Sequence, residues 1–410
     1  MVKLLKIGDK NKTHLDIQCP SDEMFFKIKN KLGRARTGTI KTAHGEIFTP
    51  GFAFVATHGT IKSLDKKEHS LASPELTISN TFHLFVTGKV KEIKKAGGLH
   101  KKFGLKNPIM TDSGGFQIFS LGWGKVHKIG KVYSKNKLST SNVDISKNPV
   151  KIGRDGVVFT YDGKKHELDP KISIKIQEDL GADIIFAFDE CTSPLHGYDY
   201  NKKSLLKTHR WAEKCLKAKK KNGQALYGIV QGGVFEDLRR ESSALIGALP
   251  FDGFGIGGSF GEKQMSDVLG WSLSGLPENK PRHLLGIGAI KDVFIGAENG
   301  IDTFDCVIPT REARHGALYS KNGRLDIQKG IFAKDNKAVE KGCKCELCSE
   351  GLKRKDIRQM FKENRAKAQS LATSHNIYFY KTLFEKIRKA IDSGKLSNWE
   401  KLKKEYKKLI

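Results

Sequence analysis

Short apolar runs recur along most of the chain, and amphipathic segments lie between several of them. Eight of these runs predict β-strands: Phe52–Ala56, Leu76–Ser79, Pro108–Thr111, Asp183–Phe188, Ala225–Val230, Phe251–Ile256, His283–Ile287 and Asp302–Ile308. Helical periodicity predicts helices at positions such as Lys202–Lys221 and Asp237–Leu249. Eight strands that alternate with helices can close into a barrel. The pattern therefore predicts the α/β fold class, as a (β/α)8 TIM barrel.

Three segments depart from this alternation. Residues 1–24 form a polar, lysine-rich N-terminal extension, and residues 25–49 contain glycine-broken runs that predict β-hairpins over one end of the barrel. Residues 125–166, between the third and fourth predicted strands, predict an inserted hairpin lobe with β-like pieces such as Gly156–Tyr161. We therefore assign the barrel to residues 25–340 and a zinc-binding, basic helical region to residues 341–410.

Polar residues and glycines follow most of the predicted strands directly. The most suggestive side chains are those of Asn80, Asp112, Asp189, Gln231, Asp305 and Arg311. In a TIM barrel the active site forms at the carboxyl-terminal ends of the strands, so these side chains are expected to meet there. Two of them have a structural alternative. Asp305 could form an ion pair with Arg311 or Arg314, and Asp189 could cap a helix.

The composition adds a strongly basic character. The 410 residues carry a formal net charge of +28, and the pI is about 9.7, so we expect the protein to attract polyanions such as nucleic acid. No apolar run is long enough to span a membrane, and the first residues lack the apolar core of a signal peptide. Seven cysteines, three of them clustered, do not suggest a secreted disulfide framework, so a cytoplasmic location is predicted.

A cysteine cluster and a later histidine predict a metal site with the ligands Cys343, Cys345, Cys348 and His375. Three sulfurs and one imidazole match a closed, structural Zn²⁺ site with no position left for a reacting water. The fourth ligand is open at this stage, since His315, His283 or His209 could compete with His375.

Several motifs occur in a fixed order between about Phe25 and the C-terminus. They are N-T-F-H-L at Asn80–Leu84, M-T-D-S-G-G-F-Q at Met110–Gln117, F-D-E-C at Phe188–Cys191, G-I-V-Q-G-G at Gly228–Gly233, F-D-C-V-I-P-T-R at Phe304–Arg311, and C-x-C-x-x-C followed by H-N. Together they resemble the bacterial form of tRNA-guanine transglycosylase, also called queuine tRNA-ribosyltransferase. The resemblance implies a TIM barrel with one structural Zn²⁺ per chain.

The resemblance also implies a reaction and its partners. Guanine at the wobble position of tRNAs with G-U-N anticodons (those for Asp, Asn, His and Tyr) would be exchanged for a 7-deazaguanine in queuosine biosynthesis. The expected partners are therefore the tRNA anticodon stem-loop and a free 7-deazaguanine base, and the family's usual assembly is a homodimer. Base exchange on one face of ribose suits two carboxylates and a covalent ribosyl–aspartate intermediate.

Roles follow for individual residues by similarity. Asp305 is expected to be the nucleophile and Asp112 the general acid/base. The expected base pocket comprises Ser113, Gly114, Gly115, Phe116, Asp189, Gln231 and Gly258. The residues expected to contact RNA are Gly286, Ile287, Gly288, Ala289, Ile290, Lys291, Asp292, Thr310, Arg311, Glu312, Ala313 and Arg314.

Three stretches depart from the family pattern, and one of them is the insertion at residues 125–166, which is longer than usual. Gly257–Glu262 reads G-G-S-F-G-E, one residue shorter than the family's G-G-L-A-V-G-E, in a loop that helps to select the incoming base. Ser259, Phe260 and Glu262 favour the small cationic base 7-aminomethyl-7-deazaguanine (preQ1). Queuine is the alternative. It is the less favoured base because its larger substituent needs space that Phe260 could fill. Lys353–Met360 lacks the tyrosine and paired histidines of the family's subunit contact, which leaves the homodimer as one option.

Three other interpretations are weaker. A non-catalytic tRNA-binding partner subunit would not need both Asp112 and Asp305. The archaeal relative that modifies the tRNA core carries a further RNA-binding domain for which this chain has no room. A barrel glycosidase acting on carbohydrate does not explain the basic surface or the guanine-shaped pocket.

Overall fold

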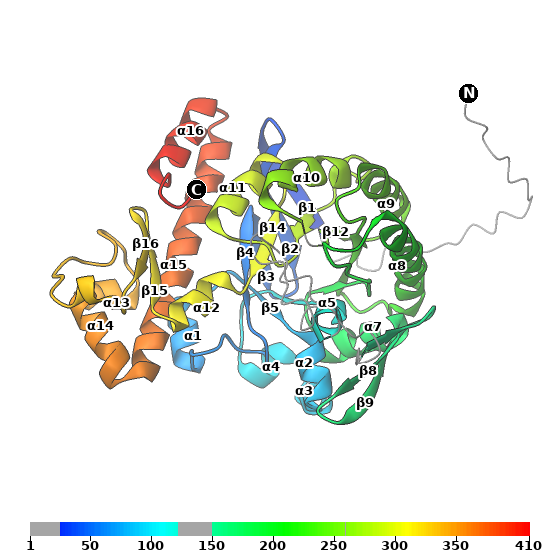
Figure 1. The fold of residues 1–410 in the computed structure, drawn as a ribbon, viewed down its shortest axis with the longest axis horizontal. Helices are drawn as coiled ribbons and strands as arrows, with labels where there is room; N and C mark the ends of the chain where they lie inside the picture. The colour runs from blue at the N-terminus through cyan, green and yellow to red at the C-terminus, as the bar shows by residue number, and fades with distance from the viewer. Residues whose placement is uncertain (1–24, 122–149, 259) are drawn as a thin grey trace, which may run out of the picture.

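The computed structural model describes residues 25–121, 150–258 and 260–410. Eight parallel strands close into a barrel surrounded by helices, which confirms the predicted TIM-barrel fold (Figure 1). The barrel strands are β4 (Gly51–Val55), β5 (Leu76–Ser79), β6 (Ile109–Thr111), β10 (Ile184–Phe186), β11 (Ala225–Val230), β12 (Gly253–Ile256), β13 (Arg282–Leu284) and β14 (Thr303–Cys306). The ring closes where β14 pairs with β4.

The last barrel strand ends earlier than its apolar pattern predicts. β14 stops at Cys306, and helix α12 (Ile308–Arg314) follows with Pro309 in its first turn. Proline has no N–H to donate, and none is needed in the first turn of a helix. The predicted strand boundary at Ile308 is therefore wrong, because a helix with Pro309 in its first turn begins at Ile308. β13 also ends early, at a turn through Gly286.

The helices between the strands have one buried face each. They are α1 (Lys66–Ala72), α2 (Thr81–Val86), α3 (Lys89–Lys95), α4 (Leu99–Phe103), α5 (Gly115–Phe119), α7 (Pro170–Leu180), α8 (Tyr198–Ala218), α9 (Glu236–Ala248), α10 (Met265–Leu273) and α11 (Ile290–Glu298). In α8 a buried residue or pair recurs in every turn from Asn201 to Leu216, while most of its lysines are exposed. Helices α8 and α9 confirm the two helices predicted from periodicity.

A small antiparallel sheet covers the amino-terminal ends of the barrel strands. It consists of β1 (Phe25–Leu32), β2 (Ala35–Thr42) and β3 (Gly45–Thr49), as the glycine-broken runs predict. Ile40 and Ile47 pack with strand residues in the interior of the barrel. Arg36 donates to both carboxylate oxygens of Asp302, just before β14, at 2.9 and 2.5 Å.

The inserted lobe predicted at residues 125–166 lies partly outside the described residues. Its described part is an antiparallel sheet of β7 (Val150–Ile152), β8 (Val157–Tyr161) and β9 (Lys164–Leu168), which includes the predicted piece near Gly156–Tyr161. The ring of Phe159 is buried and lies 5.4 Å from that of Phe82 in α2. The lobe therefore packs beside the helix that follows β5.

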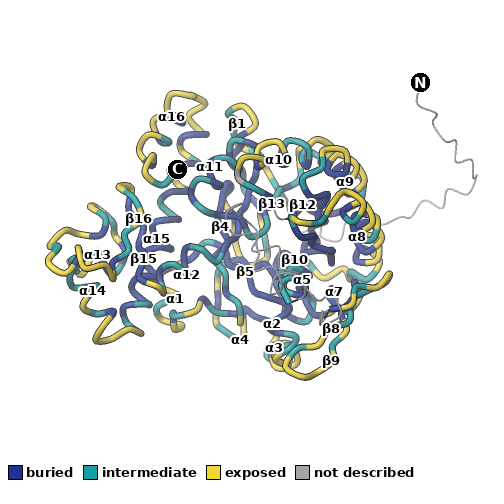
Figure 2. Tube along the Cα trace, viewed as in Figure 1, coloured by how far each residue is buried: buried dark blue, intermediate teal, exposed yellow. Residues whose placement is uncertain are grey.

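A second, smaller core lies beside the barrel (Figure 1). It includes residues of β15 (Ala317–Ser320), α13 (Glu346–Ser349), α14 (Arg354–Glu363) and the first turns of α15 (Arg365–Asp392), with β16 (Gly323–Asp326) paired to β15. The later turns of α15 and helix α16 (Leu396–Glu405) join the main core instead. Figure 2 shows α15 as a largely buried path between the two cores. Among the described residues, no helix combines the length and apolar character that crossing a membrane requires.

Candidate active site

A cavity of about 450 Å³ lies among the carboxyl-terminal ends of the barrel strands, and it is lined by residues that lie within, or directly after, each of the eight strands. Its volume is typical of small-molecule sites. Of the predicted site residues, the cavity brings together Asp112, Ser113, Phe116, Asp189, Gln231, Gly258, Gly286, Asp305 and Arg311. These residues are far apart in the sequence, and only the closure of the barrel makes them neighbours.

Asp112 follows β6, and its carboxylate is held by donors from two segments. Oδ1 accepts hydrogen bonds from the backbone N–H groups of Thr81 (2.9 Å) and Gly114 (3.2 Å). Oδ2 accepts from the side-chain amides of Asn80 (2.7 Å) and Gln117 (3.2 Å). Backbone and side-chain donors together fix the orientation of this carboxylate on the cavity wall.

Asp305 lies within β14 and lines the cavity. Its Oδ1 accepts a hydrogen bond from the backbone N–H of Gly286 at 2.6 Å and lies 3.1 Å from Nε2 of His283. His283 is fully buried on the neighbouring strand β13, and its Nδ1 lies 2.9 Å from Oγ1 of Thr303. The imidazole therefore bridges a hydroxyl and a carboxylate that lie two residues apart on β14.

Asp189 is buried beyond the end of β10. Its Oδ1 accepts a hydrogen bond from Ser113 Oγ (3.1 Å), and its Oδ2 accepts one from Gln231 Nε2 (2.6 Å). The next helix, α8, is capped by Gly197, so the helix-cap alternative for Asp189 is wrong. A Cβ added to Gly115 would lie 2.7 Å from the Asp189 carbonyl oxygen and 3.3 Å from its Oδ1, which shows how closely the start of α5 approaches this residue.

Arg239 supports another wall of the cavity from α9. Its fully buried guanidinium donates to the carbonyl oxygens of Gly233 (2.8 Å) and Gly257 (2.9 Å), and burial lowers its pKa to about 9. A Cβ added to Gly258 would lie 2.6 Å from Nη2 of Arg239, and Gly258 has a φ of +113° that favours glycine. The ring of Phe260 is also buried, 5.7 Å from the guanidinium, and is not part of the cavity lining.

Three polar atoms on the cavity wall are buried without a hydrogen-bond partner among the described residues. They are Ser79 Oγ, Gln117 Oε1 and Gln231 Oε1. A buried polar group that stays unpaired costs about 1–3 kcal/mol. A flat, polar ligand with several donors would satisfy these atoms, whereas an apolar ligand would leave them unpaired.

The predicted RNA-contacting residues divide between buried and accessible positions. The buried side chains are those of Ile287, Ile290, Asp292, Thr310 and Ala313. Glu312 accepts hydrogen bonds from Tyr319 (2.6 Å) and Arg324 (3.0 Å). Arg311 is exposed beside the cavity, and Arg314 is half-buried on the same helix, where burial and the charge of Arg311 lower its pKa. The two arginines and the half-buried Lys291 are thus the cationic side chains of this set that can reach a bound polyanion.

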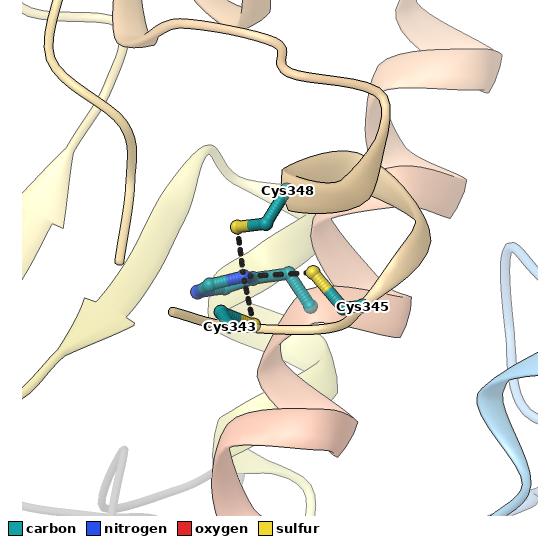
Figure 3. Close-up of side chains that lie close together, drawn as sticks. Cys343, Cys345 and Cys348 are labelled. Carbon is teal, nitrogen blue, oxygen red and sulfur yellow. Dashed lines mark hydrogen bonds between the residues drawn. The ribbon is translucent and has the colours of Figure 1, made fainter. Parts of the chain in front are cut away.

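The structure brings the predicted metal ligands together. The sulfur atoms of Cys343, Cys345 and Cys348 lie 3.8, 3.3 and 3.6 Å from Nδ1 of His375. The labelled cysteines point their sulfurs toward a shared centre (Figure 3). A tetrahedral zinc with ordinary bond lengths has sulfur–nitrogen edges of roughly 3.6 Å, so the four residues fit this ion. This geometry selects His375 over the three competing histidines.

Helix α15 links this cluster to the cavity. Nε2 of His375 lies 2.8 Å from the Tyr319 carbonyl oxygen, which leaves Nδ1 to face the sulfurs. The next residue, Asn376, donates to the carbonyl oxygen of Pro309 at 2.9 Å, in the first turn of α12. One turn further, the Tyr380 hydroxyl donates to the Gly288 carbonyl oxygen at 3.0 Å. Helix α15 therefore contacts the cysteine cluster, helix α12 with its two arginines, and the loop after β13.

Three residues with no predicted catalytic, base-binding or RNA-binding role hold the site together, namely Asn80, His283 and Arg239, and of these only Asn80 is expected at this end of the barrel from the sequence. Asn80 carries a sequence signal, since it follows a strand and opens the N-T-F-H-L motif. His283 carries none, because only the pairing of β13 with β14 makes it a neighbour of Asp305. Arg239 lies in a helix rich in charged residues, where a buried guanidinium is not distinguishable from an exposed one.

Comparisons with known proteins agree with this arrangement. A family model described as "Queuine tRNA-ribosyltransferase" matches residues 31–408. A queuine tRNA-ribosyltransferase from Protochlamydia amoebophila is 44% identical over 90% of this chain and 95% of its own length. The corresponding enzyme of Halothermothrix orenii is 41% identical over 88% and 92%, and that of Herpetosiphon aurantiacus is 40% identical over 89% and 88%. The similarity therefore covers the barrel and the cysteine cluster alike.

Proposed function

Because this chain belongs to the queuine tRNA-ribosyltransferase family and is therefore a tRNA-modifying pentosyltransferase, we propose that it exchanges the wobble guanine of tRNA for a 7-deazaguanine. The expected tRNAs are those with G-U-N anticodons, and the product belongs to queuosine biosynthesis. The observation that carries the proposal is the cavity itself. Two carboxylates, Asp112 and Asp305, line one base-sized space together with unpaired polar atoms.

In the first half of the reaction, the target guanosine leaves the anticodon stack and enters the cavity. A carboxylate oxygen of Asp305 forms a bond to C1′ of the ribose, and the C1′–N9 bond breaks with its electron pair going to the guanine. Asp112 supplies the proton that neutralises the departing base. The hydrogen bond from Gly286 keeps the Asp305 carboxylate oriented for this attack.

In the second half, the incoming 7-deazaguanine occupies the space that guanine left. Asp112, now a carboxylate, accepts the N9 proton of this base, and N9 forms a bond to C1′. The C1′–oxygen bond of the ester breaks, and its electron pair returns to Asp305. Two inversions restore the original face of the ribose, and the ester conserves the glycosidic bond energy.

The wall of the cavity that contains Asp189 and Gln231 is proposed to recognise the base. The Asp189 carboxylate can accept hydrogen bonds from the N–H groups on the edge of a guanine-type base, and Gln231 Oε1 is an unpaired acceptor beside it. Ser113 and Gln231 hold that carboxylate in place. Phe116, at the start of α5, offers a face on which the base can stack. Gly258 lines the cavity without a side chain, and Gly114 and Gly115, which do not line it themselves, let the backbone between Ser113 and Phe116 pack closely against its neighbours.

Contacts to the anticodon loop are assigned to α12. Arg311 is exposed beside the cavity and Arg314 lies on the same helix, so both can bind phosphates or base edges next to the flipped nucleotide. The formal charge of +28 supplies the longer-range attraction to tRNA.

The cysteine–histidine group is proposed to hold one Zn²⁺ per chain. A bound zinc would cross-link the small core by tetrahedral coordination. The residues Cys343, Cys345, Cys348 and His375 lie away from the catalytic cavity lining, so the ion has a structural role. A cytoplasmic location and a homodimer complete the proposal.

The incoming base is proposed to be preQ1, with queuine as the second candidate. The small aminomethyl group of preQ1 needs only one acceptor at the edge of the pocket. One observation favours queuine: the Phe260 side chain packs near Arg239 and does not fill the cavity, so it does not exclude a larger substituent. Of the other two residues of this loop invoked for selectivity, Ser259 lies outside the described residues, and the side chain of Glu262 is not described.

The test is base exchange on tRNA. The enzyme should incorporate radiolabelled guanine into bulk tRNA, and a protein that binds tRNA without incorporating label would be the non-catalytic subunit instead. Labelled tRNA is then chased with preQ1 or queuine at equal concentrations. preQ1 should release the label faster. A tenfold advantage for queuine, about 1.4 kcal/mol in transition-state binding, would assign queuine as the substrate.

A further inference from the structure

His283 occupies an unusual place for a fully buried histidine. Both of its ring nitrogens contact β14, where Nδ1 lies 2.9 Å from Thr303 Oγ1 and Nε2 lies 3.1 Å from Asp305 Oδ1. The ring of Phe186, from β10 across the barrel interior, lies 5.2 Å away at an angle of 48°. Aromatic packing and two polar contacts thus fix the plane of the imidazole.

The Thr303 contact has a consequence for the proton on the imidazole. A carboxylate can only accept a hydrogen bond, so Nε2 must carry the proton that it shares with Asp305. Nδ1 of a neutral ring then accepts a hydrogen bond from the Thr303 hydroxyl. If the ring is protonated, Nδ1–H donates to the same hydroxyl and the Nε2–H group still points at Asp305. In both protonation states, the contact with Thr303 keeps the Nε2–H group of His283 directed at the Asp305 carboxylate.

We propose that His283 is a positioning residue that favours release of the ribose from Asp305, a role that rests on the proposed covalent chemistry. When the incoming base attacks C1′, the C1′–oxygen bond breaks and negative charge returns to the carboxylate. The N–H groups of His283 and Gly286 both point at Oδ1, where part of that charge accumulates. The imidazole keeps its proton throughout and stabilises the leaving carboxylate through the hydrogen bond alone.

This role separates the two halves of the reaction. A donor at Oδ1 stabilises the carboxylate more than the ester, so it assists breakdown of the covalent adduct and does little for its formation. A residue that only filled space would affect both steps equally.

The experiment measures the two steps separately on the full-length, metal-loaded protein. Adduct formation is followed on denaturing gels with a tRNA anticodon stem-loop, and breakdown is followed by chasing the adduct with labelled guanine. In His283→Phe, breakdown should slow about tenfold or more while formation changes less than about threefold. The adduct should therefore accumulate during turnover.

Conservative variants add a readout that a structural role would not give. His283→Gln places an amide N–H near the position of Nε2 and should restore breakdown to within about threefold of wild type. His283→Asn places its amide near Nδ1 and should not restore it. Thr303→Val removes the hydroxyl that orients the ring and should slow breakdown by a smaller factor. His69→Phe, at another buried histidine on α1 that does not line the cavity, is the matched control and should leave both rates unchanged.

Several outcomes would overturn the role of His283. They are a folded His283→Phe that breaks down the adduct within twofold of wild type, an equal loss in both steps, or equal rescue by asparagine and glutamine. If thermal unfolding shows that His283→Phe does not fold, the role of His283 is decided by comparing the rates of adduct breakdown in His283→Gln and His283→Asn. Failure of the wild-type protein to form an adduct or to exchange guanine would instead reject the proposed function.

Discussion

The two ends of the barrel bury the same kinds of side chain for different purposes. At the amino-terminal end, Asp302 is completely buried and receives two hydrogen bonds from Arg36, while Asp183 binds two histidines. At the carboxyl-terminal end, Asp305 is also buried and Asp112 is partly buried, but both line a cavity. Burial next to a basic group therefore does not distinguish Asp305, which lines the cavity, from Asp302, which does not. The adjacent open space does.

The pKa shifts at the amino-terminal end show how differently paired carboxylates can respond to burial. For Asp302, burial raises the pKa, and the pairing with Arg36 opposes this only in part. For Asp183, burial also raises the pKa, but hydrogen bonds from His100, Ile109 and His44 outweigh it and hold the pKa below its ordinary value of 3.8. Asp183 therefore stabilises the folded state in its ionised form.

The largest expected effect is a loss of activity on substitution at the carboxyl-terminal end of the barrel. Asp305→Asn should lower guanine exchange by at least about 10³-fold, or about 4 kcal/mol in the barrier, because the amide is a poor nucleophile. The affinity for tRNA should stay within severalfold, since phosphate contacts dominate binding. Exchange assays and filter binding measure the two effects. If Asp305→Asn kept its turnover and Asp112→Asn trapped the adduct, the two roles would be reversed.

The second effect tests whether the cysteine–histidine group stabilises the carboxyl-terminal end of the barrel through α15. The purified protein should carry about one zinc per chain, and Cys345→Ser should remove most of it and lower Tm by roughly 10 °C or more, because site formation is coupled to folding. Loss of exchange should follow the loss of folded protein. Metal analysis, calorimetry and activity are compared with Cys215→Ser, at a buried cysteine outside the cluster, which should keep its metal. A metal-free, folded and fully active Cys345→Ser would contradict the structural role.

The third effect is a loss of folding stability at the amino-terminal end of the barrel. Arg36→Met leaves Asp302 buried without its main partner and should lower the free energy of unfolding by about 3–5 kcal/mol in urea titrations. The remaining folded protein should exchange guanine at the wild-type rate, because Arg36 does not line the cavity. A stable variant with impaired exchange would show that the two ends are coupled.

The smallest effect concerns pH. A carboxylate with a lowered pKa contributes stability above its unfolded pKa, and this contribution is lost as the pH falls through the folded pKa. Asp183→Asn should therefore be less stable than wild type at pH 6, by about 1–3 kcal/mol, and the difference should shrink as the pH falls below 3.8. Urea titrations at several pH values measure this difference. A difference that is constant over the whole range would mean that Asp183 contributes only through its shape.

The sequence predicts some of these features better than others, for physical reasons. The barrel is predictable because each buried strand is a short apolar run, and the metal group because three of its four ligands lie within one segment. Asp112 and Asp305 are identified through family motifs, since burial alone also fits Asp302. The contact between His283 and Asp305 depends on the register of β13 and β14, which a single sequence does not specify. Pro309 is ambiguous in the sequence, because proline both ends strands and begins helices.

The closure of the barrel also has a consequence for how the chain is made. β4 pairs with β14, and the first sheet is attached to the far end of α15, where Asp392 accepts hydrogen bonds from Asn30 (2.8 Å) and Thr37 (2.5 Å). During synthesis, the early strands leave the ribosome long before these partners exist. One edge of β4 therefore stays open until β14, which ends at Cys306, has emerged, so the closure of the barrel depends on contacts between distant parts of the chain. Cells that make this protein should need chaperones most while that edge is uncovered.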